Sequence, residues 1–201
     1  VRVTCITHRK DPIVMGVISQ FPPSESSMIK RALLEAGLKK HLTEDLNLPG
    51  IHDVHALEAG GGTATLWISM KKMYSGHVDQ TAFGTMGHFG MSYFKWIVIC
   101  DDDIDINDAF MRDWVMAWRV RPDKDIKLIP NTASVELDPS SFEPGKSQAD
   151  ISGAKMIIDA TKKWDYPEVS LPPLEQLREV ADNWGDYGLP PLDELKLPRE
   201  E

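Results

Sequence analysis

Residues 96–106 read WIVICDDDIDI, an apolar run that leads directly into a cluster of acidic residues. A short, continuous apolar run bounded by turn residues is typical of a strand buried on both faces, as found in sheets that helices cover on both sides. On either side of this run, the apolar periodicity alternates between two and about 3.6 residues. The pattern predicts an α/β fold: a three-layer α/β/α sandwich around a mostly parallel or mixed sheet.

The remaining elements follow from the same periodicities. We expect residues 1–6 and 13–18 to be extended, strands at 51–57, 65–70, 126–129 and 155–160, and helices at 27–42, 78–91, 108–117 and 174–184. The first helix has an apolar stripe that we expect to face the core, made of Ile29, Leu33, Ala36 and Leu38. Gly60–Gly62 separates two predicted strands, which favours a hairpin connection.

Composition excludes several classes of function. The chain has 201 residues, 42% of them hydrophobic, which is enough for one domain with an appendage. Its net charge of −9 argues against nucleic acid and anionic membrane surfaces as partners. Two cysteines make no disulfide framework, so we expect a reducing, cytoplasmic location. No apolar run is long enough to predict a membrane span.

The composition changes near residue 165. Residues 165–201 hold ten acidic and three basic residues and six of the fourteen prolines, so this segment cannot build its own core. We therefore divide the chain into an α/β domain at 1–164 and an extended acidic, proline-rich C-terminal tail at 165–201, with one short helix. The chain opens VRVTCITHRKDP without Met, and we interpret it as a piece of a longer protein.

The acidic cluster Asp101–Asp105 allows two interpretations. Ligands bind at the carboxyl ends of strands in open α/β sheets, and oxygen clusters there can hold Mg²⁺. A stand-alone Mg²⁺-dependent phosphotransfer or ligand-binding domain is thus one hypothesis. The alternative, favoured here, is a turn that caps the next helix, because no phosphate-binding loop is present. The later RVRPDKD stretch predicts an exposed turn with local ion pairs.

Five stretches together resemble the C-terminal part of the UbiD family of decarboxylases, over about residues 4–164. They are PPSES at 22–26, TLWISMKK followed by YSGH at 65–77, WIVICDDDIDI at 96–106, WVMAWRVRPDKD at 114–125 and GAKMIIDATKKW at 153–164. The resemblance implies a carboxy-lyase that acts reversibly on an aromatic or α,β-unsaturated carboxylic acid. In this family the acidic cluster is a structural turn.

The resemblance also implies where the chemistry lies. The family uses prenylated FMN with Mn²⁺ and K⁺, held mainly by an upstream flavin-binding domain that also carries a Glu–Arg–Glu network. No residue of this chain matches that network, so we assign no catalytic or metal position and expect the chain alone to be inactive. The C-terminal domain is expected to build a homodimer or higher homo-oligomer and to close over the substrate.

The family's substrate lid matches the loop around Leu137. The matching residues are Val135, Glu136 and Leu137, and Leu137 is the best match for the side chain over the substrate. Glu136 departs from the Pro found in some relatives. We expect Glu136 and Asp138 to face water while Leu137 points inward. Ser92 and Tyr93 match a second pocket-facing position.

Overall fold

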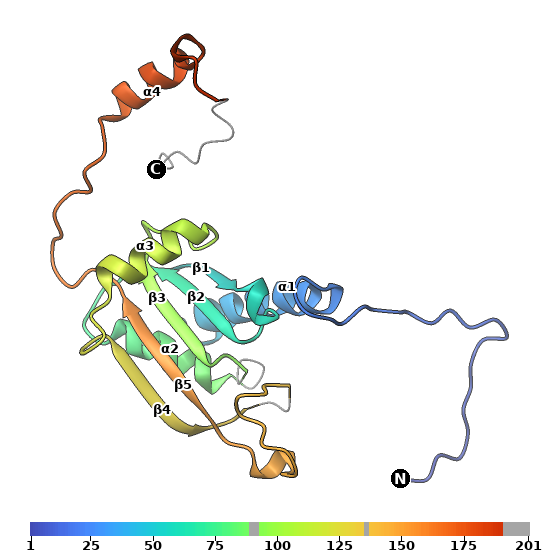
Figure 1. Ribbon diagram of the computed structural model, residues 1–201. Helices are drawn as coiled ribbons and strands as arrows, with labels where there is room; N and C mark the ends of the chain where they lie inside the picture. Colours follow the sequence, from blue (N-terminus) through green and yellow to red (C-terminus); the bar gives the residue numbers. More distant parts are fainter. Residues whose placement is uncertain (89–92, 135–136, 191–201) are drawn as a thin grey trace. The chain divides into compact units, whose positions relative to one another are not determined.

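The computed structural model describes residues 1–88, 93–134 and 137–190 (Figure 1). It divides into two compact units, Val1–Thr161 and Lys162–Glu201, which we describe separately.

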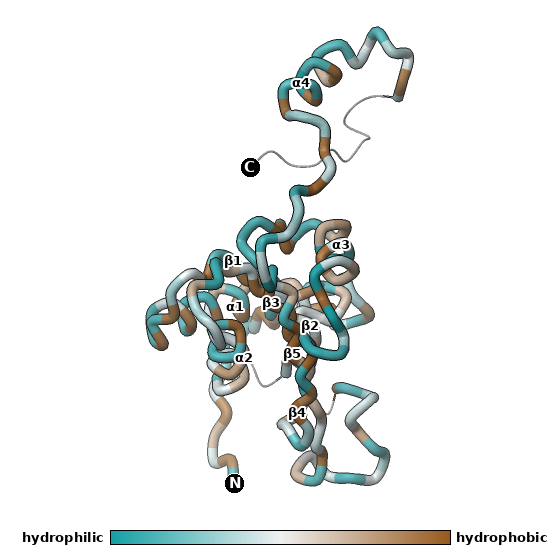
Figure 2. Tube along the Cα trace, turned by 90° about the vertical axis from the view of Figure 1, so that its left-hand side faces the viewer, coloured by the Kyte–Doolittle hydropathy of each residue, from teal (hydrophilic) through white to brown (hydrophobic). Residues whose placement is uncertain are grey.

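The first unit is built on a mixed five-stranded sheet. Its strands are β1 (Ile51–Ala56), β2 (Thr65–Met70), β3 (Trp96–Asp101), β4 (Ile126–Thr132) and β5 (Gly153–Ala160), in the order β1-β2-β3-β5-β4. The central strands β2, β3 and β5 are parallel, and the two edge strands run antiparallel to their neighbours. In Figure 2 the apolar residues gather along the central strands, as expected of strands covered on both faces.

Helices cover both faces of this sheet, which confirms the predicted three-layer α/β arrangement. The helices α1 (Glu25–Lys40) and α2 (His77–Gly87) lie on one face, and α3 (Ala109–Arg119) lies on the other (Figure 1). The α1/α2 face buries Leu38, Leu42, Val54, Ala56, Leu66, Ile68, Met70, Val78, Ala82, Ile97, Ile99 and Ile157. The α3 face buries Trp67, Val98, Cys100, Ile104, Ile106, Val115, Ile158 and Ala160.

Two local expectations need correction. Residues 1–23 form neither helix nor strand, and the apolar side chains of Ile6, Ile13 and Val14 are exposed, because no neighbouring strand pairs with this segment. The predicted stripe of α1 is also wrong in part. Leu38 is buried, but Ile29 and Leu33 are exposed, since the helix packs on the sheet through Leu34, Leu38 and, one turn further, Leu42.

The hairpin between β1 and β2 is confirmed. The glycines that connect these strands adopt positive φ, 64° at Gly61 and 68° at Gly62, and a short 3₁₀ turn at Glu58–Gly60 precedes them. Glycine is favoured in this backbone region because a Cβ atom is strained there. The turn brings the polypeptide directly against the start of α1.

The second unit contains α4 (Leu174–Asp182) and a 3₁₀ turn at Trp184–Tyr187. Within 162–190, the part of this unit that the structure describes, no residue is buried. The indole Nε1 of Trp184 donates to the carbonyl oxygen of Pro190 at 2.6 Å. Among the described residues of the whole chain, no helix has the length and apolar character required to cross a bilayer.

Candidate functional site

The loop between β4 and β5 is organised around Asp138. Its carboxylate accepts hydrogen bonds from the backbone N–H and hydroxyl of Ser140, at 3.0 and 2.7 Å, and from the Ser141 hydroxyl at 3.1 Å. It also accepts two bonds from Lys95 Nζ, at 3.0 and 2.8 Å. Its backbone carbonyl accepts from the N–H groups of Ser141 and Phe142, both at 3.0 Å. The same residue therefore closes a turn and ties the loop to the sheet.

Lys95 precedes β3 and is itself held firmly. Its N–H donates to the Ala64 carbonyl at 3.0 Å, and its carbonyl accepts from the Met156 N–H at 2.7 Å, so its backbone joins the entry to β2 to Met156 within β5. One residue earlier, the Phe94 carbonyl accepts from the buried Lys155 Nζ at 2.7 Å. Burial lowers the pKa of this Lys155 ammonium.

Two of the predicted pocket residues lie near the Lys95–Asp138 ion pair, at the end of the sheet where β3 begins. Leu137 immediately precedes Asp138 and is 87% exposed, and Tyr93, two residues before Lys95, is 44% exposed. Ser92, Val135 and Glu136, which were also predicted to face the pocket, lie outside the described residues.

The expectation that Asp138 faces water while Leu137 points inward is wrong for both residues. The Asp138 side chain is only 14% exposed, because its carboxylate points to Lys95, whereas the Leu137 side chain projects outward. Burial alone would raise the pKa of Asp138, but the hydrogen bonds from Lys95, Ser140 and Ser141 outweigh it and lower the pKa to about 2. The carboxylate is therefore ionised throughout the neutral range, as the contact with Lys95 requires.

An open depression of about 440 Å³ lies beside this loop. It is lined by Lys95, Trp96, Leu128, Ser140, Ser141, Ser152, Gly153, Ala154, Lys155 and Met156. Its chemistry is that of serine hydroxyls and apolar side chains, with the Lys95 ammonium already bound to Asp138 and Ser140.

The acidic turn after β3 has a structural role. Arg119, at the end of α3 and only 5% exposed, donates to Asp101 at 3.0 Å and forms a two-pronged contact with Asp103, at 2.8 Å for each bond. Its guanidinium also lies 5.4 Å from the centre of the Trp114 ring. Asp108, rather than the cluster itself, caps α3 through the Phe110 N–H.

This arrangement corrects one interpretation of RVRPDKD. Arg121 and Asp123 form the exposed local ion pair that was predicted. Arg119, in contrast, is a buried partner of the acidic turn, and only the packing of α3 against β3 shows this. The arrangement favours a structural turn over a Mg²⁺ site, because the Arg119 guanidinium binds two of the carboxylates, Asp101 and Asp103, that the metal would need.

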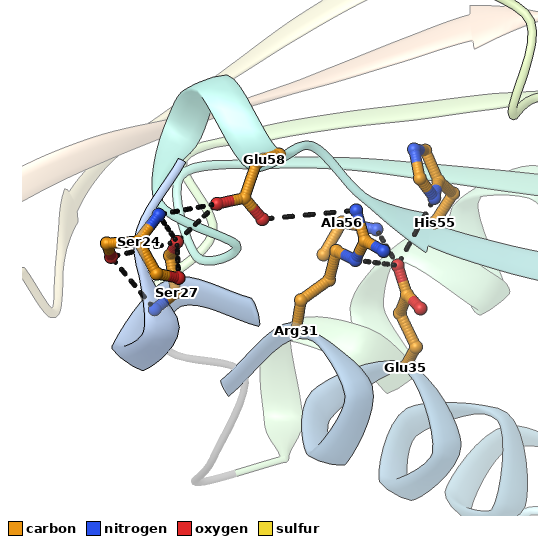
Figure 3. A network of polar contacts seen from close by, with 7 residues as sticks. All are labelled: Ser24, Ser27, Arg31, Glu35, His55, Ala56 and Glu58. Carbon is orange, nitrogen blue, oxygen red and sulfur yellow. Dashed lines mark hydrogen bonds and ion pairs between the residues drawn. The ribbon is translucent and has the colours of Figure 1, made fainter. Parts of the chain in front are cut away.

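A second polar network fixes the start of α1 (Figure 3). Ser24 and Ser27 form a reciprocal capping box, with bonds of 3.2 and 3.1 Å between each hydroxyl and the other backbone N–H. The Ser27 hydroxyl also donates to Glu58, in the turn after β1. Arg31 Nη1 lies 3.9 Å from the other Glu58 oxygen. The role of Glu58 was not predicted from the sequence, because Glu58 lies 31 residues from Ser27 and only the packing of the turn against α1 brings them together.

Further along α1, Glu35 joins the helix to β1. Its Oε1 atom accepts from the Ala56 N–H at 2.9 Å and lies 3.2 Å from His55 Nδ1 and 3.7 Å from Arg31 Nε (Figure 3). Burial lowers the pKa of His55, although Glu35 acts in the opposite direction. His52 and His55 lie three residues apart on β1, so their side chains point to opposite faces of the sheet and share no ligand geometry.

The described residues do not fit the metal ion that the resemblance implies. Among them, no group of three or more His, Cys, Asp or Glu side chains could hold a metal ion. The Lys95 ammonium is engaged by Asp138, so it offers no free cation to a flavin phosphate. Cys100 is buried, and burial raises the pKa of its thiol to about 12, which leaves it unreactive.

Residues 27–160 match the model of the 3-octaprenyl-4-hydroxybenzoate carboxy-lyase C-terminal domain, the C-terminal domain of UbiD. This chain belongs to the UbiD family. The match covers most of the α/β unit, including the acidic turn and the loop around Asp138, and confirms the resemblance.

Two relatives are uncharacterized proteins of Aeropyrum pernix and Aquifex aeolicus. They are 30% identical over 195 residues and 32% identical over 194 residues, which covers 94% and 93% of this chain. The chain spans only 38% of the length of each relative.

Solved UbiD-class structures share the fold. The closed form of vanillic acid decarboxylase from Sedimentibacter hydroxybenzoicus aligns with a TM-score of 0.73 and 29% identity, over 89% of this chain and 37% of that one. HmfF from Pelotomaculum thermopropionicum, in complex with FMN, gives 0.64 and 26%, over 79% and 35%. The apo 3,4-dihydroxybenzoic acid decarboxylase of Enterobacter cloacae gives 0.61 and 25%, over 78% and 34%. The chain thus contains a UbiD C-terminal domain.

Proposed function

We propose that this chain is the lid and oligomerisation domain of a UbiD-like carboxy-lyase that acts reversibly on an aromatic or α,β-unsaturated carboxylic acid. The observation that carries the proposal is the placement of Leu137. This apolar side chain projects from a loop tied to the sheet through Asp138 and Lys95. An outward apolar side chain on an anchored loop suits a cover that a substrate meets from outside the domain.

The proposed enzyme assigns the chemistry to an upstream domain and the covering of the substrate to this one. In the proposed enzyme, prenylated FMN with Mn²⁺ and K⁺ supplies the chemistry of decarboxylation and is bound by an upstream flavin-binding domain. Leu137, Val135 and Glu136, with Ser92 and Tyr93, would cover the substrate. An apolar cover excludes water and orients the carboxylic acid against the reactive ring. On its own, the chain should release no CO₂.

The proposed homodimer or higher homo-oligomer is supported by unpartnered apolar surface. Met28, Ile29 and Leu33 are exposed on α1, where a monomeric helix would ordinarily carry polar residues. Light scattering at micromolar concentration should show a mass above that of one chain, and a monomer at all concentrations would contradict this part of the proposal. A cytoplasmic location is proposed with it.

The test of the lid is Leu137→Ala in the enzyme that contains this domain together with its flavin domain. We expect a lower kcat/KM for the native acid, by about 10-fold or more, and relatively better use of bulkier acids, because one apolar contact is worth roughly 1–3 kcal/mol. The melting temperature should stay nearly constant, since Leu137 is almost fully exposed. Val169→Ala, an exposed truncation in the tail, is the matched control. Unchanged kinetics on acids of two sizes would refute the assignment.

A further inference from the structure

We infer that Lys95 and Asp138 are positioning residues for the reaction: their ion pair couples Leu137 and Tyr93, the two residues proposed to cover the substrate, into one unit. The inference rests on the proposed function and goes beyond it, because it assigns a role to two polar residues that do not themselves face the substrate.

The first step is the rigidity of the Lys95 side of the pair. Its backbone is hydrogen-bonded on one side to Ala64, at the entry to β2, and on the other to Met156 in β5. The preceding carbonyl, of Phe94, accepts from a buried ammonium. Tyr93 therefore stands next to a segment that the central sheet holds from two sides.

The second step is the organisation of the Asp138 side. The carboxylate closes the turn through Ser140 and Ser141, and the backbone carbonyl of Asp138 holds Ser141 and Phe142. Across the loop, the backbone of Gly153 lies close to Ser134: a Cβ atom added at Gly153 would lie 3.1 Å from the Ser134 Cβ. Asp138 therefore holds the turn at 138–142 together, and Leu137 is the residue directly attached to it.

The third step is the connection between the two sides. Lys95 Nζ donates to both carboxylate oxygens and to the Ser140 hydroxyl at 2.9 Å, so each of its three protons has an acceptor. Ion pairs that are open to solvent contribute little to stability. This pair is partly shielded, with 30% of the Lys95 side chain and 14% of the Asp138 side chain exposed. Its geometry suits the placement of a loop more than the stabilisation of a fold.

The inference predicts that the pair controls orientation at the active site. Without it, Leu137 and Tyr93 would move independently, and a misplacement of about 1 Å can cost on the order of 100-fold in rate. We expect Lys95→Met and Asp138→Asn each to lower kcat by about 10-fold or more while KM changes less, because the loss is in orientation and not in uniform binding.

The experiment combines kinetics of the flavin-loaded enzyme with hydrogen exchange of the 201-residue chain. The double variant should be no slower than either single variant, since residues that act as a unit are not additive. Lys95→Arg, which keeps the charge and the two-pronged contact, should recover most of the rate. Lys127→Met is the matched control and should behave as wild type. It removes the exposed ion pair between Lys127, on the edge strand β4, and Asp79, on α2.

Hydrogen exchange supplies a readout that does not depend on activity. In Lys95→Met, the amides of Ser140, Ser141 and Phe142 should exchange at least several-fold faster, with the amides of β3 unchanged. Unaltered exchange, or unaltered kinetics in an active enzyme, would overturn the inference and leave the proposed function standing. A wild-type enzyme that decarboxylates no acid would overturn the proposed function, whereas the exchange result would still report whether Lys95 holds the loop.

Discussion

Arg119 is the side chain on which the acidic turn depends. Its guanidinium is nearly fully buried, and its two carboxylate partners are mostly covered. We predict that Arg119→Met lowers the free energy of unfolding by about 3–5 kcal/mol, because it leaves uncompensated charge at a buried site. Urea denaturation measures this loss. Arg121→Met, which removes an exposed pair, is the control, and equal losses in the two variants would contradict the account.

His77 makes the stability of the fold depend on pH. The ring is fully buried, its Nδ1 accepts from the Met73 N–H at 3.3 Å, and it stacks on Tyr74. Burial lowers the pKa of His77 below 6.5, and the Pro49 backbone offsets this only in part. The unfolded chain therefore binds a proton more readily than the folded one, so stability present at pH 7 is lost as the pH falls through 6.5.

We predict that the melting temperature falls between pH 7.5 and 5.5, and that His77→Gln makes this fall smaller. Glutamine can accept the same hydrogen bond without gaining a charge. His52→Gln, at an exposed position on β1, should leave the pH dependence as it is in the wild type. Parallel slopes for the wild type and His77→Gln would show that another group is responsible.

The connection between β1 and β2 determines how α1 sits on the sheet. At Gly62, with φ of 68°, a Cβ atom would lie 2.9 Å from the Ser27 carbonyl oxygen and 3.0 Å from the Arg31 Cβ. At Gly61, with φ of 64°, the nearest atom would be 4.0 Å away. Both positions carry the cost of a left-handed residue, but only Gly62 also carries a steric clash with the helix.

We predict that Gly61→Ala costs about 1–2 kcal/mol, from the backbone alone. Gly62→Ala should cost about 1–3 kcal/mol more, because it forces apart a close contact between turn and helix. Chemical denaturation of the two variants gives the difference directly. If the two losses are the same, the turn does not constrain α1.

At the level of the whole molecule, the two units differ in the amount of hydrophobic core that the described residues form. Both hydrophobic clusters lie within Val1–Thr161, whereas none of the described residues of 162–190 is buried. We predict that a chain ending at Thr161 unfolds in one cooperative transition, with a melting temperature within about 4 °C of the 201-residue chain. Differential scanning calorimetry tests this, and a broad transition without a heat-capacity peak would contradict it.

Features with short-range causes could be predicted from the amino-acid sequence alone. Apolar periodicity identified the five strands and the order of the helices, and the glycine run identified the hairpin. Each of these depends on residues a few positions apart, where the preference of the backbone and the spacing of apolar side chains decide the outcome. Motifs along the same stretches indicated the UbiD family, which residues 27–160 confirm.

Contacts between distant segments required the tertiary structure. Lys95 and Asp138 are 43 residues apart and meet only because β3 and β5 are neighbours in the sheet. Tertiary packing of other elements places Arg119 on the acidic turn, through α3 against β3, and leaves Ile29 and Leu33 exposed, because α1 packs through Leu34 and Leu38. The type of a side chain determines which groups it can bind, but the packing of distant segments determines which of those groups lies within its reach.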